Sequence, residues 1–193
     1  MINKQELEAF MKEHDKYCSF TDWSKGVNVT YSDVKNKFLD NFVFVALNPT
    51  KSCHAFHSDS LQDKNLEYIF KGSKNVYYIT DLIKLDPKMF KDNKKVTDSR
   101  SVVKWLKDED EGKDEDKTML NSYIKTLKTE ISLIGGNPTI VTFGDAVYRL
   151  LLENKCKLCN CERPIKIEKV LHFSRNSRED VKKQLEHLGV VIE

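Results

Sequence analysis

The sequence lacks the long apolar run that a membrane-spanning helix requires. None of its 193 residues belong to a stretch approaching the roughly 20 apolar residues that span a bilayer. Residues 1–5 lead directly into charged residues, which argues against the apolar stretch of a signal peptide. Hydrophobic residues make up 39% and charged residues 32%, a composition typical of a folded globular protein. We therefore expect one soluble, cytoplasmic domain over residues 1–193, with no membrane partner.

The chain also lacks a strong charge of either sign. Its net charge of +2 is smaller than is usual for a protein that clamps duplex DNA non-specifically. The segment 107–117 (KDEDEGKDEDK) is strongly acidic, so the remainder is more basic and leaves room for a local basic face. We expect this segment to be a flexible, solvated surface loop, and a DNA-mimicking role is the weaker alternative.

The sequence has only five cysteines, and three of them lack the fourth ligand that a metal site needs. An odd number of cysteines in a cytoplasmic chain does not predict paired disulfides. The spacing of Cys156, Cys159 and Cys161 suits tetrahedral zinc, and iron–sulfur clusters also use cysteine ligands. No second paired motif accompanies it, since Cys18 is isolated and Cys53 is the only thiol near the expected ligand pocket. We expect free thiols, with no metal and no cofactor.

Apolar, β-branched runs alternate with helical patterns along the chain. Buried strands separated by helices predict an α/β fold, here a three-layer αβα sandwich with a mainly parallel, four-stranded central sheet. Residues 190–192 are a candidate for a short additional edge strand. The predicted strands are 42–47, 76–80, 139–143 and 165–171, and the predicted helices are 2–15, 61–70, 119–134, 145–152 and 177–188.

Polar residues follow each predicted strand, where a parallel sheet places its ligands. Taken singly, each group has a structural explanation as a turn or as the cap of a helix. Taken together, at successive strand ends, they favour one shared pocket. The groups are Asn48-Pro49-Thr50, Thr80-Asp81-Leu82, Gly144-Asp145 and His172-Phe173-Ser174.

These segments resemble the motifs of the uracil-DNA glycosylase superfamily, and the resemblance covers most of the chain. Ala46–Thr50 (ALNPT) resembles the first motif, and Ile79–Lys84 (ITDLIK) resembles the strand end that reads the base. Val141–Leu151 (VTFGDAVYRLL) resembles the glycine turn and helix that precede the last motif, H-P-S-x-x-S, to which Leu171–Ser177 (LHFSRNS) is similar. The chain looks closest to a bacterial branch with N-P-[ST], T-D-[IL]-[IV]-K and H-[FY]-S.

The resemblance implies a DNA-repair hydrolase that flips a uracil or modified base out of DNA and cleaves its N-glycosidic bond in base excision. Asn48 would orient the attacking water, and His172 would stabilise the negative charge that develops on the leaving base. The implied partner is single- or double-stranded DNA, bound by a monomer. The remaining implied contacts are Phe56, Asp81 and Ser174 to the base, and Thr50, Arg175 and Asn176 to DNA.

The loop after the first strand holds further candidates. Phe56 is placed to stack on a flipped base, although an aromatic ring there is equally explained by core packing. His57 or Asp59 would supply a general base, and His54 lies in the same loop. Simple surface positions are the alternative for all three.

The chain departs from the superfamily pattern at four positions. Ala46 and Thr50 replace glycines, Phe173 replaces a proline, and Asp81 replaces the asparagine that reads the base. An ionised aspartate only accepts hydrogen bonds, so Asp81 would prefer an exocyclic amino group or would need a proton to read uracil. The alternative hypotheses are a non-catalytic nucleic-acid or nucleotide-binding module that keeps the fold, and an enzyme acting on a small nucleotide.

Overall fold

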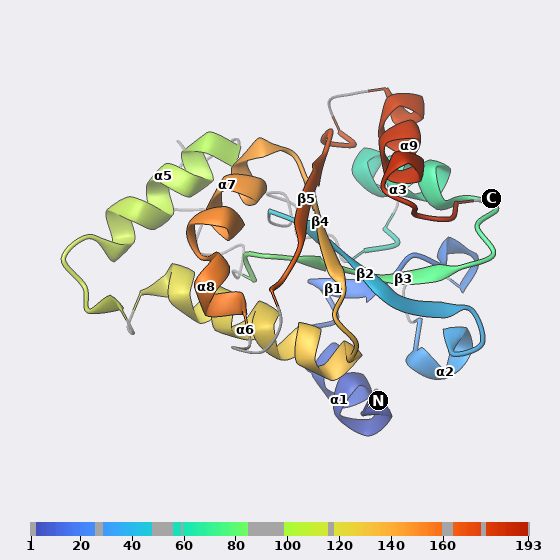
Figure 1. The fold of residues 1–193 in the computed structure, drawn as a ribbon, viewed down its shortest axis with the longest axis horizontal. Helices are drawn as coiled ribbons and strands as arrows, with labels where there is room; N and C mark the ends of the chain where they lie inside the picture. The colour runs from blue at the N-terminus through green and yellow to red at the C-terminus, as the bar shows by residue number, and fades with distance from the viewer. Residues whose placement is uncertain are drawn as a thin grey trace.

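A five-stranded, mostly parallel sheet forms the centre of the molecule in the computed structural model (Figure 1). The structure describes residues 3–25, 29–47, 56–58, 60–84, 99–115, 118–159, 164–174 and 177–192. The strand order is β1-β3-β2-β4-β5, in which β1 is antiparallel to β3 and the other neighbours are parallel. The strands are β1 (Cys18–Phe20), β2 (Phe38–Ala46), β3 (Val76–Asp81), β4 (Thr139–Phe143) and β5 (Ile167–Val170).

The sheet reverses its direction of winding at β2. From β2 the chain crosses to β3 on one side, then returns past β2 to β4 and β5 on the other side. Open parallel sheets bind ligands beyond the carboxyl ends of their strands at such a reversal, because the two loops there leave the sheet in opposite directions. The topology therefore predicts a ligand site at the edge formed by the carboxyl ends of β3, β2, β4 and β5.

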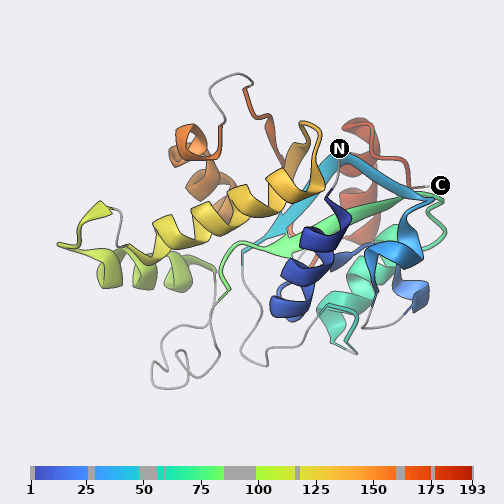
Figure 2. The ribbon, with the colours of Figure 1, turned by 90° about the horizontal axis from the view of Figure 1, so that it is seen from below.

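Helices cover both faces of the sheet, and each face has its own apolar cluster. Side chains from α3 and α9 pack on one face, whereas those from α1, α2 and α5 to α8 pack on the other. Figure 1 shows α3 beside α9 on one side of the sheet, with α1 and α6 on the opposite side, and Figure 2 shows α5 running beneath α6. The helices are α1 (Lys4–Glu13), the 3-10 helix η1 (Trp23–Lys25), α2 (Tyr31–Val34), α3 (Leu61–Phe70), α5 (Ser99–Asp110), α6 (Met119–Ile134), α7 (Asp145–Glu153), α8 (Lys155–Leu158) and α9 (Arg178–His187).

The predicted parallel sheet is confirmed, with strands at all four predicted places. It has five strands and not four, because the short β1 adds to the edge of β3. Residues 190–192 do not form a strand; Val190 and Ile192 are instead buried in the cluster under α3 and α9. Within the described part of the chain, no helix is both long and apolar enough to cross a membrane.

The prediction of a loop over residues 107–117 is wrong at its start. Lys107–Asp110 form the last turn of α5, whose apolar residues Val102 and Leu106 anchor the helix to the sheet. The acidic residues Asp108 and Glu109 of this turn are helical and exposed to solvent. Asp110 has a structural role as well, since its carboxylate accepts hydrogen bonds from the N–H groups of Met119 (2.7 Å) and Leu120 (3.0 Å) at the start of α6.

Candidate functional site

Asp81 ends β3 and is held in place through its backbone. Its N–H donates to the carbonyl of Tyr17 (2.7 Å), which precedes the edge strand β1. The pairing of β2 with β3 continues one residue further, because Leu82 N–H donates to the carbonyl of Ala46 (2.8 Å). The Lys84 ammonium donates to the carbonyl of Asp81 itself (2.6 Å). Asp81 therefore has a fixed position at the carboxyl edge of the sheet.

The Asp81 side chain is buried and chemically unusual. Only 5% of the residue is exposed, and no side chain among the described residues donates a hydrogen bond to its carboxyl group. Burial raises the pKa of Asp81 to about 8; Lys84 opposes the shift, and the negative charges of Asp63 and Glu130 add to it. At pH 7 the group is therefore mainly a neutral carboxylic acid, with one O–H donor and one carbonyl acceptor.

A fully buried ion pair supports the turn that follows β3. The Lys84 ammonium lies 3.2 Å from Glu130 Oε1, and their side chains are 5% and 0% exposed. The hydroxyls of Tyr78 (3.0 Å) and Thr80 (2.8 Å) donate to the same oxygen, and Lys84 donates to the Thr80 hydroxyl (2.8 Å). Glu130 Oε2 is buried with no hydrogen-bond partner. The network thus ties α6 to the segment that carries Asp81.

His172 lies beyond the carboxyl end of β5, two strands away from β2. The N–H of Ser174 donates to its Nδ1 (3.2 Å), and the Ser174 hydroxyl lies 2.7 Å from the same nitrogen. Because Nδ1 accepts a backbone N–H, the neutral ring carries its proton on Nε2. His172 packs directly on Gly144, where a Cβ would lie 3.2 Å from the ring and where φ is +91°. Glycine at this position therefore permits the close approach of the histidine.

Phe173 and Phe56 are both buried in the core. Phe173 is 4% exposed, and its ring packs edge-on against Phe143 with centroids 4.9 Å apart. The Asn65 amide of α3 donates to the carbonyl of Phe173 (3.0 Å), which fixes the loop that carries His172. Phe56 is 7% exposed and belongs to the same apolar cluster. The buried Phe173 ring thus anchors this loop.

Asp81 and His172 lie at the same edge of the sheet but not in contact. Their strands β3 and β5 are separated by β2 and β4, so three strand spacings, roughly 14 Å in all, lie between them. They therefore stand on opposite sides of the winding reversal. Other predicted site residues lie outside the described residues: Asn48, Thr50, His54, Asp59, Arg175 and Asn176.

A polar cluster that sequence reasoning only partly identified lies on the Asp81 side of this edge. His57 Nε2 is 2.7 Å from the Ser19 hydroxyl of β1, and its ring lies against Trp23 with centroids 4.6 Å apart. His57 has φ of +70°, and its buried Nδ1 has no hydrogen-bond partner. Burial lowers the pKa of His57, and the nearby negative charges of Asp63 and Asp22 oppose this shift. The ring is therefore neutral at pH 7, as a general base requires.

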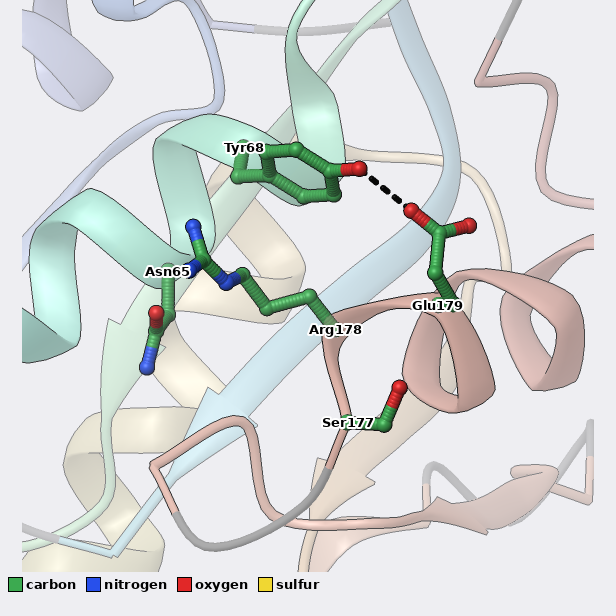
Figure 3. A pocket seen from close by; sticks show the side chains of 5 residues that line it. All are labelled: Asn65, Tyr68, Ser177, Arg178 and Glu179. Carbon is green, nitrogen blue, oxygen red and sulfur yellow. Dashed lines mark hydrogen bonds between the residues drawn. The ribbon is translucent and has the colours of Figure 1, made fainter.

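A cavity of about 470 Å³ opens beside this edge, between α3 and the start of α9. In Figure 3 the Arg178 guanidinium lies over the Tyr68 ring, 4.8 Å from its centroid, and the Tyr68 hydroxyl donates to Glu179. Neither Asp81 nor His172 lines this cavity. The lining residues are Asn65, Tyr68, Ser177, Arg178 and Glu179.

The cysteine trio is only partly described. Cys156 is exposed within α8, Cys159 directly follows that helix, and Cys161 lies outside the described residues. Cys18 is buried in β1, where burial raises the pKa of its thiol to about 12. Among the described side chains, no group of three or more His, Cys, Asp or Glu residues is placed to hold a metal ion.

Comparison of the chain with family models, with curated proteins and with solved structures found no match. The function of the chain must therefore be inferred from the residues at the carboxyl edge of the sheet and from their geometry.

Proposed function

We propose that this chain is a DNA glycosylase-like protein that holds a flipped uracil or modified base between Asp81 and His172 and hydrolyses its N-glycosidic bond. The observation that carries the proposal is Asp81, whose carboxyl group is held at the end of β3 beside the winding reversal of the sheet, on a residue that is only 5% exposed. Helices on both faces of the sheet support the three-layer αβα architecture expected for the superfamily.

In the proposed reaction, water attacks the sugar carbon while the bond to the base breaks, and the base departs with the bonding electrons. His172 would donate from Nε2 to a base oxygen as negative charge develops there. The contact from Ser174 to Nδ1 supports this role because it selects the required tautomer. Asn48 would hold the water, and the proton that the water loses would pass to solvent or to His57. The neutral Asp81 would pair with the base edge as an amide would.

The protein would act as a monomeric single domain on single- or double-stranded DNA. A non-catalytic nucleic-acid or nucleotide-binding module is the second candidate. The net charge of +2 and the negative charge of Asp63, which acts on Asp81, favour it, because both weaken attraction to the DNA backbone.

An oligonucleotide assay tests the proposal. Each substrate carries one uracil, hypoxanthine, xanthine or modified pyrimidine, and is incubated with excess protein at fixed salt and then treated with alkali. We expect strand cleavage at one of these bases with the parent protein, and cleavage about 100-fold slower or more with His172→Ala. Binding without cleavage would favour the non-catalytic module. The absence of both binding and cleavage would contradict the glycosylase and any module that binds nucleic acid.

A further inference from the structure

The cavity between α3 and α9 has a planar, cationic wall. The Arg178 guanidinium lies over the Tyr68 ring, 4.8 Å from its centroid, and both residues line the cavity (Figure 3). The Tyr68 hydroxyl donates to the Glu179 carboxylate, which holds the ring in place. Tyr68 is 44% exposed, and Arg178 takes part in no salt bridge within the described part of the chain. The stacked pair is therefore fixed, and part of its surface is open to a ligand.

The charges that line this cavity cancel. Arg178 is cationic and its neighbour Glu179 is anionic, whereas the other lining residues are neutral. A small anion would meet the carboxylate as well as the guanidinium, so the lining does not favour a free phosphate. The planes of tyrosine rings and arginine guanidinium groups are instead surfaces on which unpaired nucleobases stack. A planar, uncharged base therefore suits the cavity better than an anion does.

The cavity shares a wall with the loop that carries His172. Asn65 lines the cavity and is 8% exposed, and its amide donates to the carbonyl of Phe173 (3.0 Å), the residue after His172. Ser177, at the other end of the same loop, also lines the cavity. A base in the cavity would therefore lie beside the loop that presents His172 to a flipped base. This is where the next nucleotide of the same strand would lie.

We propose that the cavity between α3 and α9 binds the base next to the flipped one, stacked on the pair formed by Arg178 and Tyr68. This inference rests on the proposed function, to which it adds a second base site. Stacking requires only the face of a base, so the site accepts any of the four bases. An intact duplex keeps the neighbouring base paired and stacked, so the second site favours single-stranded DNA.

Single-stranded probes that lack one base test the inference. The complete probe is a thymidine pentanucleotide with a central 2′-deoxypseudouridine, whose carbon–carbon glycosidic bond cannot be hydrolysed. Two further probes replace the 5′ or the 3′ neighbour of the central base with an abasic tetrahydrofuran unit, which keeps every phosphate. Binding to the full chain is measured by calorimetry at fixed salt. We expect one replacement to weaken binding about tenfold, within the usual range for one stacked base, and the other to change it little.

Variants of the stacked pair link this difference to its residues. Tyr68→Leu removes the ring, and Arg178→Lys keeps the charge but removes the guanidinium plane. In both variants the complete probe should bind about as weakly as the affected abasic probe, so the difference between the probes disappears. Tyr148→Leu is a matched control, because Lys169 lies over this ring at 5.5 Å and α7 covers the other face of the sheet. The tenfold difference should persist in this control.

The outcomes separate this inference from the proposed function. Equal binding of all three probes by the parent protein overturns the second base site and leaves the pocket for the flipped base in place. A difference that survives in folded Tyr68→Leu, or in Arg178→Lys, overturns the role of the stacked pair. Failure of every probe to bind overturns the proposed function together with the inference. If Tyr68→Leu does not fold, as judged by circular dichroism, Arg178→Lys decides, because Arg178 is exposed on the surface.

Discussion

Replacing Lys84 with methionine is expected to lower the free energy of unfolding by about 3–5 kcal/mol. Glu130 is fully buried, and Lys84 is the cation paired with it at 3.2 Å. Methionine fills a similar volume but leaves the carboxylate without a counter-charge, and a buried unpaired charge is among the most costly defects in a folded protein. Urea unfolding at pH 7, followed by circular dichroism, measures the loss.

The double variant Lys84→Met with Glu130→Gln serves as the control. Glutamine keeps an oxygen for the hydroxyls of Tyr78 and Thr80, and it removes the charge. We expect the double variant to recover more than half of the lost stability, because the cost lies in the unpaired charge and not in packing. Equal urea midpoints for the parent protein and Lys84→Met would contradict the assignment of a stabilising buried ion pair.

His172→Ala is expected to lower the single-turnover rate of base release by about 100-fold or more, if the proposed glycosylase activity is present. The expected size reflects the loss of one preorganised donor to the leaving base, and Asn48→Ala should have an effect of the same order. Folding should change little, since His172 is only half-buried and its loop remains anchored by Phe173 and Asn65.

His187→Ala provides a matched control for this experiment. His187 ends α9 on the surface, where its ring contacts the carbonyl of Lys183, so its removal should leave the rate unchanged. Rates for His172→Ala within twofold of those for the parent protein would remove His172 from the mechanism.

The sheet could be predicted because its strands carry their own signal. The run Phe42–Leu47 is apolar at every position, as a strand covered on both faces must be, and β2 is buried over its second half. The helix over 119–134 was predicted with its observed bounds, since Gly135 ends it with φ of +81°. The strand Cys18–Phe20 could not be recognised in this way, because three residues are too few to show a pattern of apolar side chains. Its partner β3 also lies far away in the sequence.

The site could be predicted only in part, because the sequence indicates where strands end but not which side chains meet across different elements. Asp81 ends β3 and His172 lies just after β5, so their place at the sheet edge follows from the topology. Glu130 lies on the apolar stripe of α6, three residues after Leu127. An acidic side chain at such a buried position indicates that a cationic or hydrogen-bonding partner is buried beside it. No pattern in the sequence says that this partner is Lys84. Asp63 was missed because its place three residues after Ser60 is typical of an ordinary helix cap.

The state of the Asp81 carboxyl tests the central claim most directly. Carbon-13 NMR of protein labelled at aspartate side-chain carbons, assigned with Asp81→Asn, follows its ionisation with pH. We predict a midpoint near pH 8, with the neutral acid below it and the carboxylate above it, and a change in this midpoint when a nucleoside binds. An Asp81 signal that titrates near pH 4 and does not respond to any nucleoside would contradict a buried, base-reading carboxyl at this edge.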